Sequence, residues 1–370
     1  MMKDQLPAGR IFISGTMRGG SSVTSNVLNA HSKILVMGEY VHFFRFIYKH
    51  YDPLNRNNVE RMLKEMHARL YWRYKVEVEV EDILEDIASV GYTYKNVYDA
   101  IMRYYLIKFG KSICGEDAAL EWRNIPEFLS IFPDAKVIHV CRDPRSIVAS
   151  WSKASYHEID NLVTIFNCID ALDKCIYYKK ILPKKNFYYF RYEDLIRKPE
   201  VEVSKLCNFL EIEQEPLMLQ PEKWDDVFDG VYVKRGWSSH VGVMTKGFDI
   251  SRVDAWKQSL EDWKLCLCEC LAKERLEEFG YELSGRKFDV DTIYKGINTL
   301  RNSNLLYKCL SVWLSQNQGF QGPPSDPRDP RTWGMGSKGK KKKFVDSEDG
   351  KTYLKVISEI RKSYDDDNNI

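Results

Sequence analysis

A glycine-rich segment near the amino terminus has the residue types and spacing of an anion-binding loop. It reads GTMRGGSS (15–22) and lies between an apolar run and a helical pattern. The backbone N–H groups of such a loop, and the positive end of the helix dipole that follows, favour phosphate or sulfate. The spacing from Gly15 to Gly20 matches a P-loop, but Ser21 stands where a P-loop has lysine, and Arg18 supplies the cation. The segment alone also fits an ordinary turn.

A second basic segment, CRDPRSIVAS (141–150), follows another apolar run. Arg142 comes at the predicted carboxyl end of a strand, where open α/β sheets bind ligands. Asp143 and Pro144 are suited to begin a helix. Ser150 lies about two helical turns further on, so Arg142 reaches the same anion only by folding back over that helix. Taken alone, the segment also fits a helix cap with an ion pair.

The two segments together indicate an anion that arginines neutralise without a metal. A nucleoside triphosphate needs a lysine and Mg²⁺ at its β- and γ-phosphates. The first segment has no such lysine, and the strand before the second segment ends in Cys141-Arg142, which is a basic end. The sequence offers no convincing acidic strand end to hold Mg²⁺.

Short apolar runs predict the strands that position these segments. The runs are RIFIS (10–14), KILVM (33–37), SICGE (112–116), KVIHVC (136–141) and NFYYFR (186–191). Helical patterns lie between them, and continuous apolar runs are typical of a parallel sheet covered on both faces. We predict an α/β, three-layer, P-loop-like fold with a central parallel sheet, in which the first two strands are neighbours.

Composition divides the chain into parts. Residues 1–285 are predicted to form the α/β domain, and its aromatic and charged block at 39–110 predicts a helical cap over the substrate. This block also fits a purely structural insertion. We expect a helical extension at 286–315, a flexible linker at 316–345 and a tail at 346–370 with one short amphipathic helix.

Charge and hydropathy exclude several protein classes. The 370 residues carry 55 Lys+Arg and 53 Asp+Glu, a net charge of +2, which argues against a globally basic nucleic-acid binder. No apolar stretch reaches the roughly 18–20 residues that span a bilayer. Nine cysteines form no CxxC pair, which suits a reducing compartment. We expect a cytoplasmic protein with no nucleic-acid partner and no membrane span; its oligomeric state is open.

Four segments occur in an order that resembles the sulfotransferases that use 3′-phosphoadenosine 5′-phosphosulfate (PAPS). Besides the two anion segments, they are FRYEDLIRKPEVEVSKLCNFLEI (190–212) and VDAWKQSL…LEEFGYEL (253–283). The first loop is similar to the Arg-Ser-Gly-Thr-Ser branch of bacterial and tyrosylprotein sulfotransferases, with Gly19 for the usual Ser and Ser21 for the usual Thr. The resemblance covers about 10–284 and implies a metal-independent transfer of a sulfuryl group from PAPS.

The resemblance also implies which residues hold the donor. Those for the 5′-phosphosulfate would be Arg18, Gly19, Gly20, Ser21 and Ser22. Arg142 and Ser150 would hold the 3′-phosphate, and Tyr192 would contact the adenine. Ser239 and Lys246 occupy the place of the family's late donor-covering loop, although that segment also fits a plain surface loop.

Deprotonation of the acceptor needs a general base, which contributes roughly 10²–10⁴ in rate. In the resembling branch a glutamate follows the second strand, and here Glu39 stands there, with His42 as a reserve base. Both also fit structural roles, Glu39 as a residue near a helix start. Many relatives carry Gly-Glu-Lys-Thr-Pro before the second anion segment, and its lysine stabilises the leaving group. This chain has GEDAA (115–119), with Asp117 in place of that lysine.

The aromatic and basic cap favours a small-molecule or carbohydrate acceptor with a hydroxyl or amine. Two other functions stay open at this point. A P-loop kinase-like enzyme would bind ATP with Mg²⁺ through Ser21 or Ser22. A non-catalytic protein with a decayed donor site would retain nucleotide binding without turnover, and Asp117 favours it.

Overall fold

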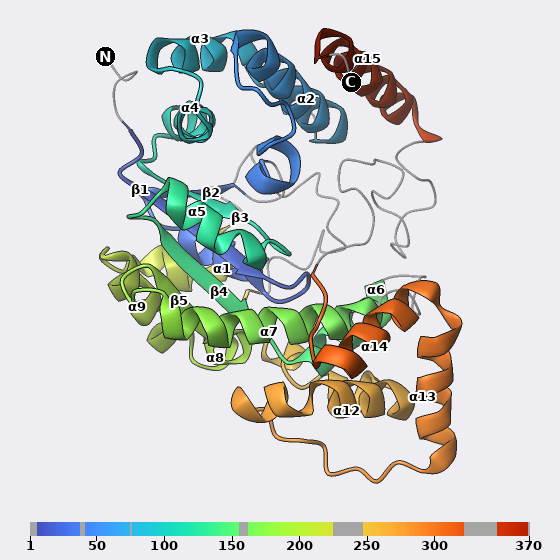
Figure 1. Cartoon of the computed structure of the whole chain (residues 1–370). Helices are drawn as coiled ribbons and strands as arrows, with labels where there is room; N and C mark the ends of the chain where they lie inside the picture. The colour runs from blue at the N-terminus through green and yellow to red at the C-terminus, as the bar shows by residue number, and fades with distance from the viewer. Residues whose placement is uncertain are drawn as a thin grey trace.

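A five-stranded parallel sheet with helices on both faces forms the centre of the molecule (Figure 1). The computed structural model describes residues 6–37, 41–74, 76–154, 162–224, 247–321 and 346–368. The strands are β1 (Gly9–Gly15), β2 (Ile34–Met37), β3 (Ile113–Asp117), β4 (Lys136–Cys141) and β5 (Phe187–Arg191). Each lies where an apolar run predicted it, and the α/β class with a central parallel sheet is confirmed.

The strand order is β2-β3-β1-β4-β5. Our expectation that β1 and β2 are neighbours is wrong, because β3 lies between them. In β3, Glu116 pairs with Met37 of β2 on one side and with Phe12 of β1 on the other. The long connection that contains the cap returns the chain into this gap. Since chain order reverses around β1, the carboxyl ends of β1 and β4 flank the crevice where such sheets bind ligands.

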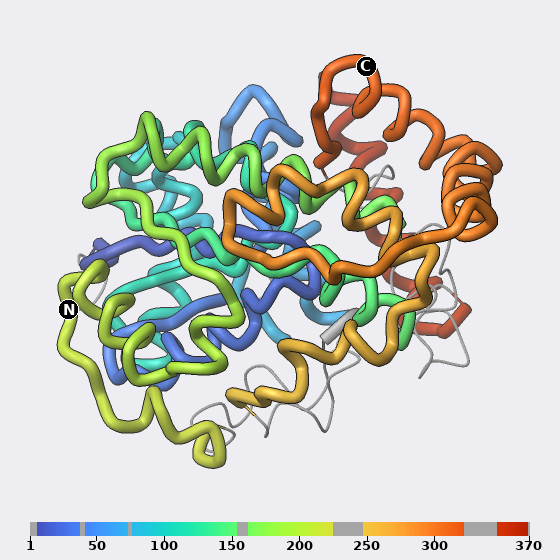
Figure 2. The backbone as a smooth tube through the Cα atoms, turned by 90° about the horizontal axis from the view of Figure 1, so that it is seen from below, coloured from blue at the N-terminus to red at the C-terminus, as the bar shows by residue number. Residues whose placement is uncertain are grey.

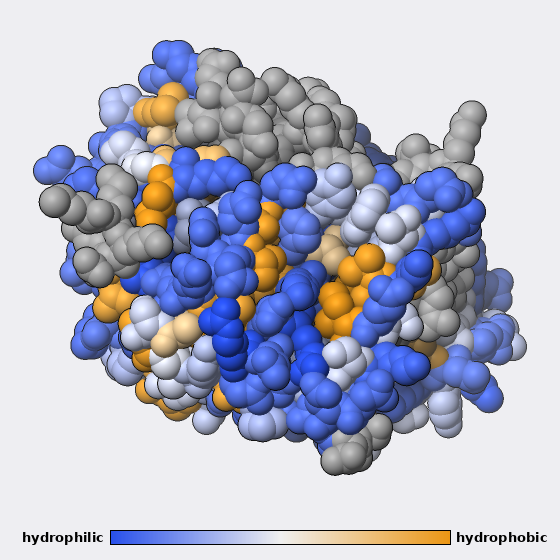
Figure 3. Space-filling view, turned by 90° about the horizontal axis from the view of Figure 1, so that it is seen from above, coloured by the Kyte–Doolittle hydropathy of each residue, from blue (hydrophilic) through white to orange (hydrophobic). Residues whose placement is uncertain are grey.

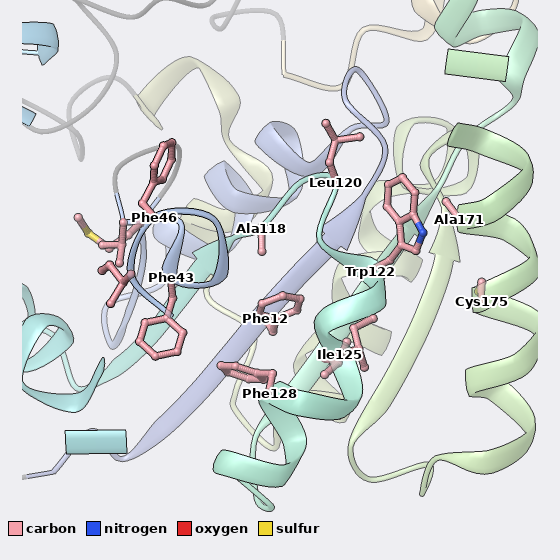
Figure 4. Close-up of a cluster of buried hydrophobic side chains, with 14 of the residues drawn as sticks. Phe12, Phe43, Phe46, Ala118, Leu120, Trp122, Ile125, Phe128, Ala171 and Cys175 are labelled. Atoms are coloured by element: carbon pink, nitrogen blue, oxygen red, sulfur yellow. The ribbon is translucent and has the colours of Figure 1, made fainter. Parts of the chain in front are cut away.

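The side chains of β1 alternate between two apolar clusters. Ile11 and Ile13 pack with α1 (Ser21–Asn29), α8 (Tyr192–Arg197) and α9 (Pro199–Leu210). Phe12 points to the opposite face and packs against Phe128, with ring centroids 4.7 Å apart (Figure 4). The helices on that face are α4 (Tyr94–Phe109), α5 (Ile125–Ile131) and α7 (Val163–Ile181). Both faces of the sheet are therefore buried, as the continuous apolar runs predicted.

The block at 39–110 is helical in its described part. After β2 come a π-helical turn, η1 (Phe43–Ile47), then α2 (Arg56–Tyr74), α3 (Val80–Val90) and α4. The tail forms α15 (Glu348–Asn368), which packs against α2 (Figure 1). Tyr353 and Ile357 are buried in this contact, so the tail covers a cap helix of its own chain.

The remaining helices lie around the end of the sheet that carries the second basic segment. They are α6 (Pro144–Ala154), α11 (Trp256–Ser259), α12 (Asp262–Glu278), α13 (Val290–Asn302) and α14 (Asn304–Gln316). Short 3-10 turns are η2 (Trp122–Asn124), η4 (Pro216–Leu219), η5 (Pro221–Lys223) and η7 (Ile250–Arg252). In Figure 2, the orange segment from α12 to α14 runs from the middle of the view to its right edge.

The surface on the cap side is mostly hydrophilic, with apolar residues in separate patches (Figure 3). Among the described residues, none of the helices combines the length and apolarity needed to span a membrane. All nine cysteines are free thiols.

Candidate anion and catalytic site

The first anion loop connects β1 directly to α1. Gly20 is the residue before the helix, and its φ of 107° belongs to the left-handed region that favours glycine. A Cβ at Gly20 would collide with the ring of Tyr192. Gly20 therefore serves both the turn and the close approach of an aromatic ring to the loop.

Arg18 leaves this loop toward α6. Its φ of 66° is also left-handed, a strained conformation for a non-glycine residue. Its Nε donates a hydrogen bond of 3.0 Å to Ser150 Oγ, and its guanidinium lies 5.9 Å from the Trp151 ring centroid. The resemblance pairs Ser150 with Arg142; in the structure Ser150 contacts the first loop.

Arg142 meets the same loop from the end of β4. Its guanidinium donates to the Arg18 carbonyl at 2.7 Å and to the Arg252 carbonyl at 3.2 Å. It also stacks over the Tyr192 ring, 4.2 Å from the centroid. Its buried Nε has no hydrogen-bond partner among the described residues. A buried guanidinium N–H without a protein acceptor is suited to an anionic ligand.

The second arginine of the basic segment has a different role. Arg145 is buried and pairs with Asp143 at 2.8 Å and with Glu269 at 2.7 Å. Asp143 also accepts from the Arg145 backbone N–H at 2.9 Å, at the start of α6. The structure thus contains the predicted helix cap with an ion pair, which Asp143 and Arg145 form. Arg142 instead contacts the first loop.

Together, five predicted donor-binding residues converge on one place. They are Arg18, Gly20, Arg142, Ser150 and Tyr192. Gly19, Ser21 and Ser22 belong to the same loop and helix start, where Gly19 N–H donates to the Thr16 carbonyl at 2.9 Å. Glu39, Ser239 and Lys246 lie outside the described residues. Chemically, this arrangement can bind an anion with two arginines and the amino end of α1.

An acidic group lies at the carboxyl end of β3, beside β1. Glu116 and Asp117 end this strand, and both are buried. The sheet order that places these two carboxyls beside β1 is not visible in the sequence. Burial, and then the neighbouring Glu121, raise the pKa of Glu116 well above its ordinary value.

His42 lies against this acidic group. Its Nδ1 is 3.4 Å from Glu121 Oε1, and the two side chains are 6% and 2% exposed. Sequence reasoning missed Glu121, because a glutamate a few residues after a strand looks like any surface glutamate. Burial raises the pKa of Glu121 to about 7, with Arg45 and Asn124 opposing the shift and Asp117 adding to it. Such a carboxyl changes its charge near neutral pH.

A thiol and imidazole cluster lies deeper in the sheet. His139, Cys141 and Cys175 are buried, and their potential ligand atoms lie within 4.8 Å of one another. Zinc sites in proteins use four ligands, or three with an open position for water. Burial raises the pKa of the Cys141 thiol well above its ordinary value, which opposes the thiolate that a metal needs. We assign no metal to this cluster.

The family model described as "Sulfotransferase family" matches residues 10–216. The sulfotransferase domain from the curacin biosynthetic pathway is 19% identical, with a TM-score of 0.49, over 76% of this chain and 100% of that domain. The sulfotransferase domain of the Synechococcus PCC 7002 olefin synthase is 16% identical, with a TM-score of 0.47, over 72% and 96%. A sulfotransferase from Mycobacterium avium is 12% identical, with a TM-score of 0.42, over 77% and 80%. No curated protein matches the sequence.

Proposed function

We propose that this chain, which belongs to the sulfotransferase family, moves a sulfuryl group from PAPS to a hydroxyl or amine of a small-molecule or carbohydrate acceptor. The observation that carries the proposal is the junction of the two arginine segments. Arg18 donates to Ser150, and Arg142 donates to the carbonyl of Arg18. A donor with phosphate groups at both ends of one adenosine needs two such anion-binding segments side by side.

The donor would be held by charge and backbone donors. The 5′-phosphosulfate would bind to the first loop, with Ser21 and Ser22. The 3′-phosphate would bind to Arg142 and Ser150, and the adenine would contact Tyr192. In the reaction, the acceptor oxygen bonds to sulfur as the bond from sulfur to the 5′-phosphate oxygen breaks. The leaving phosphate gains negative charge, which Arg18 would neutralise. The family lysine that shares this task is replaced by the buried Asp117.

Glu39 is the proposed general base, with His42 as the second candidate, and Ser239 and Lys246 are proposed to cover the donor. Glu39 follows β2, whose Met37 pairs with Glu116 of β3. Glu39 is two positions after Met37 in the sequence, and its own placement lies outside the described residues. No metal is needed, because a sulfuryl group carries less negative charge than a phosphoryl group.

A P-loop kinase-like activity is the second candidate, because β3 ends in Glu116-Asp117 beside β1. Carboxylates next to a phosphate loop are ligands that Mg²⁺ uses in nucleotide enzymes. The absence of the P-loop lysine at Ser21 opposes this candidate.

Calorimetry separates the candidates. We expect 3′-phosphoadenosine 5′-phosphate (PAP) to bind in EDTA, and AMP, which lacks the 3′-phosphate, to bind at least roughly tenfold more weakly. Absence of PAP binding at millimolar ligand, or equal binding of AMP, would contradict the donor assignment. Binding of ATP that requires Mg²⁺ would support the kinase-like candidate. PAP binding without turnover of PAPS on a panel of phenols, amines and sugars would indicate a non-catalytic protein.

A further inference from the structure

A row of exposed apolar side chains lies on helix α13. Single exposed apolar residues are normal on a protein surface, but several of them in one patch indicate a surface that binds something. Helix α13 carries four at positions i, i+3, i+4 and i+7, which share one side of a helix. They are Val290, Ile293, Tyr294 and Ile297, with exposed fractions of 80%, 41%, 66% and 47%. We call these four residues the α13 stripe.

Helix α13 packs on the protein with a different part of its apolar side. Gly296 and Leu300 are buried, and a Cβ added at Gly296 would lie 3.0 Å from the side chain of Leu267 in α12. Because successive residues turn by about 100° around a helix, these two positions lie beside the stripe rather than within it. Helix α12 therefore covers one margin of a wide apolar face, and the α13 stripe is the part that stays exposed.

Local contacts define both ends of this helix. The Asp289 side chain accepts from the Thr292 N–H at 2.7 Å at its start. Ser303 ends α13 and caps the next helix, where its hydroxyl accepts from the Leu306 N–H at 3.4 Å. Figures 1 and 2 both place α13 at the outer edge of the molecule. The stripe is therefore carried by a formed helix that a flat surface can reach.

The surface around the α13 stripe is basic. Residues 285–316 contain five Lys and Arg against two Asp, a net charge of +3, whereas the whole chain has a net charge of only +2. Arg286 is paired with Asp262 of α12. The other four basic residues are also exposed: Lys287, Lys295, Arg301 and Lys308. Such a positive field attracts an anionic partner.

We propose that the α13 stripe docks on the surface of an anionic lipid membrane. The four apolar side chains would enter the boundary between lipid headgroups and acyl chains, and the exposed Lys and Arg would contact the lipid phosphates and carboxylates. Tyr294 suits this boundary, because its ring is apolar and its hydroxyl is polar. The helix has 13 residues, fewer than the roughly 20 that span a bilayer, so it would lie in the plane of the surface. This proposal does not depend on the proposed sulfotransferase activity.

The charge around the stripe favours a membrane over a second copy of this chain. In a two-fold dimer the same surface patch meets itself. Two segments that each carry a net charge of +3 would then face each other and repel. An anionic membrane instead attracts this charge while its acyl chains take up the stripe.

Sedimentation of the full-length protein with lipid vesicles tests the proposal. We expect binding to vesicles of phosphatidylcholine with phosphatidylserine, and much weaker binding to phosphatidylcholine alone or at high salt. Tyr294→Ser with Ile297→Ser should weaken binding to the anionic vesicles by at least about tenfold. The matched control is Tyr177→Ser with Ile181→Ser in α7, where the same two residue types are 51% and 52% exposed. It should leave vesicle binding within about twofold, because these two side chains are not part of a longer apolar row.

Two further variants test the charges. Arg301→Gln with Lys308→Gln should weaken binding to the anionic vesicles by at least about fivefold. The lysine run 340–343 lies outside the described residues, and its replacement by Gln measures how much binding comes from that run. If that replacement abolishes binding while Tyr294→Ser with Ile297→Ser does not reduce it, the proposal is overturned.

Light scattering without vesicles tests the alternative occupant. We expect the same mass for the wild type and for Tyr294→Ser with Ile297→Ser. A wild-type dimer that this double variant converts to a monomer would show that a second copy covers the stripe, and would overturn the membrane assignment. Absence of sedimentation with any vesicle would overturn it as well. Loss of PAP binding in the wild type would contradict the proposed function but would leave these results unchanged.

Discussion

Arg18 Nε donates a hydrogen bond of 3.0 Å to Ser150 Oγ, across 132 positions of the chain. The bond joins the loop after β1 to helix α6, and the Arg18 carbonyl accepts from Arg142 on the other side. The two basic segments therefore form one surface. A change in either segment is expected to alter the binding of the same ligand.

Removal of the Arg142 guanidinium should weaken the proposed donor product. Arg142→Ala deletes a charged group that stacks on Tyr192 and whose Nε has no hydrogen-bond partner in the described part of the chain. We expect PAP to bind about 10- to 100-fold more weakly, because a hydrogen bond to a charged group contributes about 1.5–3 kcal/mol. The control is Arg197→Ala at the end of α8, where the arginine forms an exposed ion pair with the distant Asp254. Calorimetry in EDTA measures both, and equal affinities would contradict the assignment.

Gly20 should tolerate no side chain. Gly20→Ala combines a left-handed φ of 107° with a collision against the Tyr192 ring. Gly110 is a matched control, because it is also left-handed, with a φ of 65°, and has no atom within 4 Å of an added Cβ. We expect Gly110→Ala to cost about 1 kcal/mol in free energy of unfolding, and Gly20→Ala to cost more and also to reduce PAP binding. Urea unfolding and calorimetry check this; equal costs would refute the packing argument.

Glu121 should make the stability of the protein pH-dependent. Its pKa of about 7 exceeds the ordinary value of 4.5, so the folded state binds the proton more tightly than the unfolded state. This stabilisation is complete below about pH 4.5 and is lost as the pH rises through 7. Because Gln resembles the neutral acid, Glu121→Gln should gain on the order of 3 kcal/mol relative to the wild type between pH 5 and 8. Urea unfolding of both proteins across this pH range measures the gain. Its absence would show that the Glu121 carboxyl is not desolvated.

The tail helix should stabilise the cap through one buried carboxylate. Burial acts to raise the pKa of Glu65, but the hydrogen bond and charge of Arg361 outweigh it and hold that pKa below its ordinary value. Arg361→Ala should lower the free energy of unfolding by about 1–3 kcal/mol at pH 7. The loss should shrink as the pH falls and Glu65 is protonated. The control is Lys355→Ala in the exposed pair with Glu359, where we expect little change. Equal losses in both variants would contradict the prediction.

Local sequence patterns predicted the strands and the two anion segments. Continuous apolar runs bury residues on both faces of a sheet, and a glycine- and serine-rich turn between a strand and a helix favours an anion loop. The helix that begins at Pro144, with Asp143 as its cap, also follows from local chemistry. Glu39, Ser239 and Lys246 were proposed from the same local comparison and stay predictions.

The sequence by itself determined the parallel α/β layers, the arginine loop and the basic segment after the fourth strand. Only the tertiary structure decided that β3 lies between β1 and β2, that Ser150 bonds Arg18, and that Glu121 faces His42. The physical reason is range: strand and helix formation depend on residues a few positions apart. Sheet order and buried charge pairs depend instead on which distant segments pack against each other and exclude water from their contact.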